Sequence, residues 1–264
     1  MSRVRLDILL MRRGMFDSRE RARAAIMSGE IFVDGRRAAK PGDAIDEGLP
    51  VEYRGGRKYV SRGGLKLEKA LDFFGVVPQG RVCLDCGAST GGFTDCLLQR
   101  GAARVYAVDV GYGQLAWSLR TDGRVTVIER TNARYITQEI IPEKIDIAVA
   151  DVSFISLSLV LPAVRPLVAE GGEAVCLIKP QFEAGRDKVG KRGVVRDAQT
   201  HIEVLRGFAS GARGAGFALR GLTFSPIKGP GGNIEYLGLL AAGGGEGDGI
   251  DIAETVRLAH AELG

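Results

Sequence analysis

The sequence predicts an α/β fold, with a mostly parallel sheet covered by helices on both faces, preceded by a small α+β module. Three observations lead to this prediction. Strand-like and helical segments alternate from about residue 81, a stretch rich in glycine and arginine lies before them, and basic residues concentrate toward the amino terminus. Together they indicate two domains of different kinds.

The amino-terminal module is predicted from two short amphipathic helices within residues 5–29. Each helix ends at a glycine, and Ser18 is placed to cap the second one. Short apolar strands follow at residues 31–33 and 51–53, around an Asp-Gly turn. We therefore expect a first domain over residues 1–53.

A linker is predicted over residues 54–64, where glycine and arginine dominate and apolar side chains are few. Beyond it, a second domain over residues 65–264 contains seven apolar strand-like segments. The expected strands are 81–86, 104–110, 125–129, 145–150, 174–178, 219–225 and 234–241. The expected helices are 65–74, 92–100, 113–121, 156–168, 198–215 and 252–263. The last two strands have only a short connection, which predicts an antiparallel hairpin at the sheet edge.

Composition and charge narrow the function classes. The chain has 264 residues, 45% hydrophobic and 26% charged, which excludes a disordered chain or a small disulfide-stapled scaffold. Residues 1–66 contain 15 Lys and Arg and 9 Asp and Glu, a net charge of +6, whereas the remaining 198 contain 21 and 23, a net charge of −2. A basic first quarter predicts a polyanionic partner, with nucleic acid as the first candidate.

Targeting signals and membrane segments are not expected. The first residues are charged and lack the apolar stretch of a secretory signal. The longest apolar region, residues 145–168, is interrupted by charges and prolines, which favours a buried strand and helix over a membrane span. A cytoplasmic protein is therefore expected.

A ligand loop is predicted where the first strand of the sheet ends, between Asp85 and Thr94. Its glycines allow the backbone to approach a ligand, and the following helix offers free amide groups. The glycine spacing is neither that of a dinucleotide fingerprint nor that of a P-loop. Asp109 ends the second strand, 24 residues after Asp85, where a carboxylate accepts hydrogen bonds from ribose hydroxyls. The pattern predicts a pocket for an adenosine-containing cofactor; two aspartates that merely cap turns are the alternative.

Four further polar residues lie at the ends of expected elements: Lys66 opens a helix, Asp151 and Lys179 follow strands, and Glu235 lies within the last strand. Each of them, taken alone, is more typical of a surface charge. In a doubly wound sheet, however, the carboxyl ends of the central strands converge on one crevice. Their common location therefore predicts one site.

Seven motifs in this order closely resemble the TlyA family, whose members combine a ribosomal-type RNA-binding domain with a methyltransferase domain of the FtsJ type. The resemblance extends from about residue 3 to 242. The motifs are Ser61-Arg-Gly-Gly-Leu-Lys-Leu67, Asp85-Cys-Gly-Ala-Ser-Thr-Gly-Gly-Phe-Thr94, Asp109-Val-Gly-Tyr-Gly-Gln-Leu-Ala-Trp-Ser-Leu-Arg120, Glu129-Arg-Thr-Asn132, Asp151-Val-Ser-Phe-Ile-Ser-Leu157, Ile178-Lys-Pro-Gln-Phe-Glu183 and Gly232-Asn-Ile-Glu-Tyr236.

The resemblance implies a Rossmann-like class I methyltransferase with a seven-stranded, mostly parallel sheet. It implies an enzyme that uses S-adenosyl-methionine, without a metal, to methylate the 2′-oxygen of cytidine in ribosomal RNA. Large-subunit RNA is the first expected substrate, and small-subunit RNA is a second candidate. The implied catalytic set is Lys66, Asp151, Lys179 and Glu235. The implied cofactor residues are Asp85, Gly87, Ser89, Gly91, Phe93, Asp109 and Asn132.

The first domain resembles the small RNA-binding domain shared by a small-subunit ribosomal protein and many pseudouridine synthases. The matching residues are Arg5-Leu-Asp, Ser18-Arg19, Ala22, Ile26, Gly29, Val33-Asp34-Gly35 and Lys40-Pro41. The candidate phosphate contacts are Arg5, Arg12, Arg13, Arg19, Arg23, Arg36, Arg37 and Lys40. Solvated surface charge is the alternative for each of them. The implied partner is ribosomal RNA or a ribosomal subunit, with no membrane and no obligate protein partner.

Cysteine and histidine carry no predicted chemistry. Cys83 and Cys86 are three residues apart on a strand and face opposite sides, so neither a disulfide nor a shared metal fits. All four cysteines are expected to be reduced core residues. His201 and His260 fall in late helices, away from the predicted loops.

Two other functions compete with methyl transfer. A membrane-active haemolysin, the sense of the family's older name, requires an export signal and a membrane-active segment, and neither is visible. A ribosome-assembly protein that binds RNA without turnover is the other alternative. Replacement of Lys179 by alanine separates an enzyme, which loses methylation, from a binder, which loses nothing.

Overall fold

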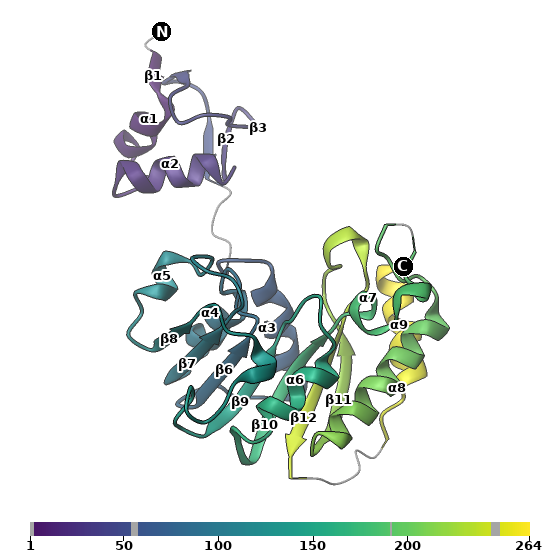
Figure 1. Ribbon diagram of the computed structural model, residues 1–264. Coiled ribbons are helices and arrows are strands. Elements are labelled where there is room, and N and C mark those ends of the chain that lie inside the picture. Colours follow the sequence, from purple (N-terminus) through teal and green to yellow (C-terminus); the bar gives the residue numbers. More distant parts are fainter. Residues whose placement is uncertain (1–2, 54–57, 191, 244–248) are drawn as a thin grey trace. The chain divides into compact units, whose positions relative to one another are not determined.

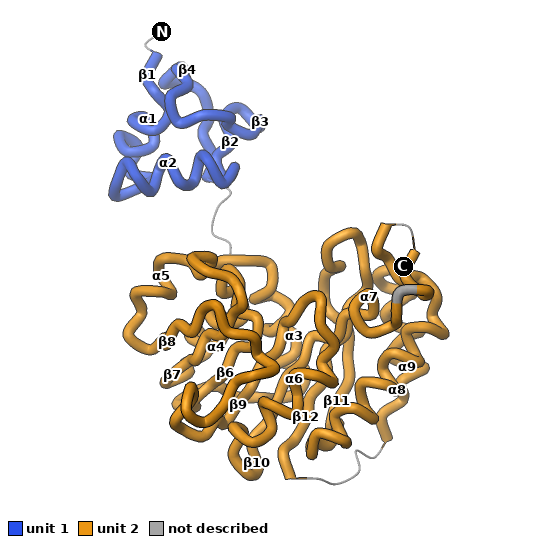
Figure 2. Tube along the Cα trace, in the orientation of Figure 1, with its two compact units in different colours: residues 1–57 blue, residues 58–264 orange. Residues whose placement is uncertain are grey.

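The computed structural model describes residues 3–53, 58–190, 192–243 and 249–264, with only the backbone at Arg186. The chain divides into two compact units, residues 1–57 and 58–264 (Figure 2). Each unit is described by itself. Of the predicted linker, residues 54–57 lie outside the described residues.

The first unit is built on two helices, α1 (Leu6–Arg12) and α2 (Arg19–Met27). Ser18 caps α2 as predicted, because its side chain accepts a hydrogen bond of 3.2 Å from the Arg21 amide. The helices bury a small apolar core that includes Leu6, Leu10, Ala22, Ile26 and Ile31. This core fixes the shape on which the basic side chains are displayed.

Five short strands complete the first unit: β1 (Arg3–Arg5), β2 (Ile31–Val33), β3 (Arg36–Arg37), β4 (Ala44–Asp46) and β5 (Val51–Tyr53). β1 pairs with β4, and β2 lies between β3 and β5, all antiparallel. The predicted α+β module is thus present in this unit.

The second unit contains a seven-stranded sheet in the order β11-β12-β10-β9-β6-β7-β8 (Figure 1). Strands β6 to β10 are parallel, and β12 is antiparallel to both of its neighbours. The predicted fold class and the hairpin at the sheet edge are therefore confirmed. The strands are β6 (Val82–Cys86), β7 (Arg104–Val108), β8 (Val125–Ile128), β9 (Ile145–Ala150), β10 (Val168–Ile178), β11 (Phe217–Phe224) and β12 (Tyr236–Ala242).

Helices cover both faces of this sheet (Figure 1). Because successive strand residues point to opposite faces, Leu84 belongs to one apolar core and its neighbour Cys83 to the other. Helices α6, α8 and α9 contribute to the first core, and α3, α4 and α5 to the second. The helices are α3 (Gly63–Phe74), α4 (Gly92–Gln99), α5 (Trp117–Arg120), α6 (Leu157–Val164), α7 (Pro180–Glu183), α8 (Ala198–Gly214) and α9 (Ile252–Leu263), with short 3-10 turns η1 (Ala133–Tyr135), η2 (Arg186–Lys188) and η3 (Pro230–Gly232).

Two predicted helices are shorter than expected. The segment 113–121 forms only α5, because Gly113 adopts a left-handed φ of 69° that a helix does not continue through. The segment 156–168 ends at Val164 in α6, and Val168 already begins β10. Pro166 follows closely and lacks the amide donor that another helical turn needs.

Residues 58–64, assigned to the linker by prediction, pack against α4. Tyr59 is 2% exposed, the Val60 amide donates to Asp95 Oδ2 over 2.8 Å, and Gln99 donates to the Lys58 carbonyl over 2.7 Å. Gly64 permits this packing, since a Cβ there would lie 2.2 Å from the Tyr59 ring. The segment thereby orders the start of α3. The domain limits at residues 53 and 65 remain a prediction.

All four cysteines are free and buried, as expected for core residues. Within the described ranges, no helix combines the length and the apolar character required to cross a membrane.

Candidate active site

Two ion pairs, one buried and one partly exposed, lie at the edge of the sheet where the central parallel strands end. Lys66, in the first turn of α3, donates to Glu235 Oε2; these residues are 7% and 0% exposed. Lys179 follows β10, and its Nζ lies 2.6 Å from Asp151 Oδ1. Lys179 also donates to Ser153 Oγ over 2.8 Å. The structure thus brings the four predicted catalytic residues together as two lysine–carboxylate pairs.

Sheet topology explains this convergence. β9 and β10 are adjacent and parallel, so Asp151 and Lys179, which follow them, emerge at the same edge. Glu235 requires a correction: it was expected within the last strand but directly precedes β12. Because β12 runs antiparallel to β10, its first residues, rather than its last, lie at this edge.

One cavity of about 290 Å³ joins these pairs to the glycine-rich loop. Of the predicted cofactor residues, Gly87, Ser89 and Phe93 line it, whereas Asp85, Gly91, Asp109 and Asn132 do not. The lining consists of Ser61, Arg62, Gly63, Lys66, Gly87, Ala88, Ser89, Thr90, Gly92, Phe93, Asp151, Ser153, Lys179, Pro230 and Glu235.

The loop requires glycine at two positions for close packing. Gly87 has φ 88°, and a Cβ there would lie 2.6 Å from the Asp151 carbonyl oxygen. Gly91, the N-cap of α4, has φ 98°, and a Cβ would lie 2.2 Å from Leu119 Cδ1. A side chain at position 87 would push the loop away from the end of β9, and one at position 91 would push it away from α5. The backbone amides before α4 therefore stay close to the cavity.

Asp109 connects two loops. Its Oδ2 accepts from the Ser89 amide over 2.8 Å and its Oδ1 from the Gly111 amide over 2.7 Å. A carboxylate has about four acceptor positions, so capacity remains for a ribose hydroxyl. Asn132 caps η1 by accepting from the Arg134 amide over 3.1 Å. The cofactor roles of both residues remain predictions.

Asp85 lies behind the cavity rather than on it. It is completely buried, and its Oδ2 accepts from Thr94 Oγ1 over 2.6 Å. Its Oδ1 has no hydrogen-bond partner within the described structure. Burial, above all, raises the pKa of Asp85 to about 7. The residue therefore supports the loop from within the sheet.

Sequence reasoning missed three residues at this site. Ser153 accepts from Lys179, and Arg62 lines the cavity; both lie within motifs quoted for the resemblance, and that was the available signal. Phe154 is 91% exposed with φ 62°, and its ring centroid lies 5.0 Å from that of Phe182. Phe154 also lies within a quoted motif; it does not line the cavity but directly follows Ser153, which does. No pattern predicts its positive φ, a strain that is commonly found at functional sites.

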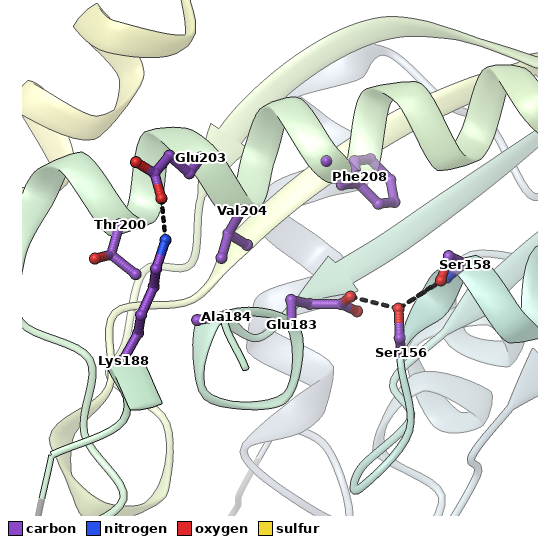
Figure 3. A pocket seen from close by; sticks show the side chains of 10 residues that line it. Ser156, Ser158, Glu183, Ala184, Lys188, Thr200, Glu203, Val204 and Phe208 are labelled. Carbon is purple, nitrogen blue, oxygen red and sulfur yellow. Dashed lines mark hydrogen bonds and ion pairs between the residues drawn. The ribbon is translucent and has the colours of Figure 1, made fainter. Parts of the chain in front are cut away.

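A second cavity, of about 330 Å³, lies between α6, α7 and α8 and contains no predicted site residue (Figure 3). Both carboxylates of this cavity already bind neighbouring groups of the protein. Glu183 accepts from Ser156 Oγ over 2.6 Å and from the Leu157 amide over 2.8 Å, while Glu203 pairs with Lys188. Glu183 thus anchors the start of α6, and this cavity is not the candidate active site.

The predicted RNA-binding residues of the first unit fall into two groups. One group is tied to the unit itself: Arg5 and Arg19 bind Asp7, Arg12 binds Glu47, and Arg13 and Arg37 donate to backbone carbonyls. The other group is exposed, and its side chains form no ion pair or hydrogen bond in the described part of the chain. Its members are Arg23, Arg36 and Lys40.

The sheet order, the glycine-rich loop and the paired lysines define a class I methyltransferase. The profile of the FtsJ-like methyltransferases matches residues 59–241, and that of the S4 domain matches residues 4–51. The chain belongs to the FtsJ-like methyltransferase family and, within it, to the group of TlyA proteins.

Three relatives illustrate the similarity. The 16S/23S rRNA (cytidine-2′-O)-methyltransferase TlyA of Mycobacterium tuberculosis is 49% identical over 89% of this chain and 88% of the relative. Hemolysin A of Brachyspira hyodysenteriae is 44% identical over 89% and 98%, respectively. A solved structure of a Streptococcus thermophilus protein that carries the name hemolysin has a TM-score of 0.77 and 45% identity, and covers 99% of this chain and 97% of that one.

The residues present fit S-adenosyl-methionine, the cofactor of this family. Glu235 Oε1 is a buried acceptor without a hydrogen-bond partner in the described structure, and it belongs to a residue that lines the cavity. Gly87 keeps the loop backbone close to Asp151, at the end of β9. An unsatisfied buried carboxylate oxygen beside a glycine-rich loop suits a ligand with a cationic end. Among the described residues, no three His, Cys, Asp or Glu side chains are grouped to hold a metal.

Proposed function

We propose that this protein transfers a methyl group from S-adenosyl-methionine to the 2′-hydroxyl of a cytidine in ribosomal RNA. One observation carries the proposal: the Lys66–Glu235 and Lys179–Asp151 pairs line the same cavity as the glycine-rich loop. The nucleotide class follows the named M. tuberculosis relative. Large-subunit RNA is the first substrate, and small-subunit RNA is the second.

The cofactor supplies an electrophilic methyl group, so the protein must align the nucleophile and take up its proton. Asp151 and Ser153 hold Lys179 Nζ from two sides. Once Lys179 has given up one proton to solvent, its neutral amine is placed to receive the proton of the 2′-hydroxyl at Nζ. Lys66, held by Glu235 across the cavity, orients the ribose.

We expect two kinds of RNA contact: phosphate contacts in the first unit and base stacking at the active site. In the first unit, Arg23, Arg36 and Lys40 are available for phosphates, which supports sequence-independent binding. At the active site, Phe154 offers an exposed ring beside Phe182. A 2′-hydroxyl in folded RNA is accessible when its nucleotide leaves the helix, and Phe154 is placed to stack on such a base. A cytoplasmic location, where ribosomal subunits are present, is part of this proposal.

The test is methylation of separate large and small ribosomal subunits with labelled donor, followed by mapping of the 2′-O-methyl positions. In Lys179→Ala we expect turnover to fall by about 10²- to 10⁴-fold, the range lost with a general base, while RNA binding persists. Lys188→Ala, which removes a partly exposed lysine at the second cavity, is the matched control and should keep full activity. Undiminished turnover in Lys179→Ala, or no methylation by the wild type, would contradict the proposal.

A further inference from the structure

A patch of aromatic and arginine side chains lies on the loops that follow β7 and β8. We call it the loop patch; it consists of Tyr112, Trp117, Arg130, Arg134 and Tyr135. The three aromatic residues are 69%, 75% and 65% exposed. Large aromatic side chains gathered on a surface are typical of interaction sites.

Each arginine of the loop patch is associated with an aromatic ring. The Arg130 guanidinium lies 4.4 Å from the Tyr112 ring centroid, and that of Arg134 lies 5.0 Å from the Tyr135 centroid. Neither arginine forms an ion pair within the described ranges. The Glu129 carboxylate, which feels the charge of Arg130, is already held by Arg120 and by the Gly113 amide. The positive charge of the patch is therefore available to a ligand.

The two loops form a single preorganised unit. The Arg130 amide donates to the Gly111 carbonyl over 3.0 Å, and the Thr131 amide donates to the Asp109 carbonyl over 3.0 Å. Arg130 has φ 54°, a conformation that a non-glycine residue keeps only when its surroundings enforce it. Asp109 also binds the Ser89 amide of the cofactor loop. The loop patch is thus fixed to the frame of the active site.

We propose that the loop patch binds an unpaired segment of the substrate RNA next to the methylated nucleotide. This inference rests on the proposed function. Unstacked bases bind to aromatic rings with little sequence preference, and neighbouring guanidinium groups neutralise the phosphates between them. Two ring–arginine pairs, Tyr112 with Arg130 and Tyr135 with Arg134, offer both kinds of contact here. The second unit therefore has an RNA surface of its own, besides the basic residues of the first unit.

Trp117 provides a local probe, because it is the single tryptophan of the chain. Titration of the full-length protein with a short single-stranded oligoribonucleotide should quench its fluorescence when a base stacks there. Tyr112→Leu/Tyr135→Leu should weaken binding about 100-fold, about tenfold for each of the two lost stacking contacts. Arg130→Gln/Arg134→Gln should lower the slope of log K against log salt by about 1 to 2.

The controls distinguish RNA binding from binding of the cofactor's adenine at the same edge of the sheet. Arg206→Gln on α8 and Phe73→Leu on α3 alter exposed residues elsewhere and should bind RNA like the wild type. Binding of S-adenosyl-homocysteine should be unchanged in the loop-patch variants. Weaker S-adenosyl-homocysteine binding with unchanged RNA binding would make the patch an adenine wall and overturn the proposal.

Two other outcomes would also overturn it: unchanged Trp117 fluorescence at saturating oligoribonucleotide, or quenching by anionic lipid vesicles but not by RNA. The titration requires no turnover. If the wild type shows the expected binding pattern but methylates no ribosomal RNA, the RNA surface stands and the proposed function fails.

Discussion

The two units each bury an aspartate completely, with opposite electrostatic results. In the first unit, Asp7 accepts from Arg5 over 3.1 Å and from Arg19 over 2.9 Å, and these bonds lower its pKa to about 2. In the second unit, Asp85 accepts from the Thr94 hydroxyl and has no cationic partner among the described residues, and burial raises its pKa to about 7. Both residues are 0% exposed.

The comparison teaches that a cationic partner, rather than burial, decides whether these carboxylates are charged. The first unit binds Asp7 with arginines that are themselves about half exposed, so its ion pairs support the fold. The second unit places the buried Lys66–Glu235 pair and the partly exposed Lys179–Asp151 pair on a cavity. These charged pairs therefore lie at the candidate active site. Removal of one partner would leave an uncompensated charge and lower the stability of the fold.

The largest effect is expected from breaking the Lys66–Glu235 pair. Lys66→Met leaves a buried carboxylate without its cation and should lower the free energy of unfolding by about 3–5 kcal/mol. Lys66→Met/Glu235→Leu removes both charges and should recover most of this loss. Urea denaturation followed by Trp117 fluorescence measures both.

Methylation assays on the same variants test whether the pair acts beyond folding. Activity should fall at least about 100-fold in the single and the double variant, because the ribose loses its orienting group in both. A double variant that regained stability and activity together would show that the pair serves the fold alone.

A smaller, pH-dependent effect is expected at Asp85. Between its unfolded pKa of 3.8 and its folded pKa of about 7, the folded protein retains a proton that the unfolded chain has lost. The contribution of Asp85 to the free energy of unfolding is therefore fully present below about pH 4. It decreases by a few kcal/mol as the pH rises toward 7. Asp85→Asn stays neutral at every pH and should lose this dependence.

The measurement is the difference in free energy of unfolding between wild type and Asp85→Asn from pH 4 to pH 8. Taking the difference cancels groups that titrate in both proteins, such as His201 and His260. The variant should gain relative to the wild type as the pH rises. A difference that is constant over this range would mean that Asp85 is ionised at neutral pH despite its burial.

Much of the second unit could be predicted because its signals are local. Buried parallel strands are continuous apolar runs, and the residues that follow them must meet at one edge. This reasoning located Asp151 and Lys179, which the structure brings within 2.6 Å of each other. Glu235 was assigned to the last strand because the sequence does not mark where that strand begins. In the structure Glu235 precedes β12, whose start lies at the same sheet edge as the ends of the parallel strands.

The remaining features depend on contacts between distant residues. Arg19 reaches Asp7 only once α2 packs on α1, so sequence could not separate it from the exposed Arg23. The exposure of Phe154 depends on its positive φ, which the surrounding fold imposes. Apolar patterning predicts a core residue in its place.

The smallest effect is expected at Asp7. Its folded pKa of about 2 lies below the unfolded value of 3.8, so its stabilisation is present above pH 4 and is lost as the pH falls toward 2. Asp7→Asn should cost about 1–2 kcal/mol at pH 7, because Arg5 and Arg19 are about half exposed and solvent screens them. Hydrogen exchange of α1 and α2 amides in the full chain reports this loss.

Asp17→Asn is the matched control, because Asp17 pairs with Arg21 on the same unit but both side chains are about 70% exposed. An exposed ion pair contributes little to stability, so hydrogen exchange of the α1 and α2 amides should barely change. As the pH falls toward and below 2, Asp7→Asn and the wild type should converge, since the wild-type carboxylate itself becomes protonated there. Equal exchange in Asp7→Asn and Asp17→Asn at pH 7 would remove the distinction between a buried, bound carboxylate and a surface one in this unit.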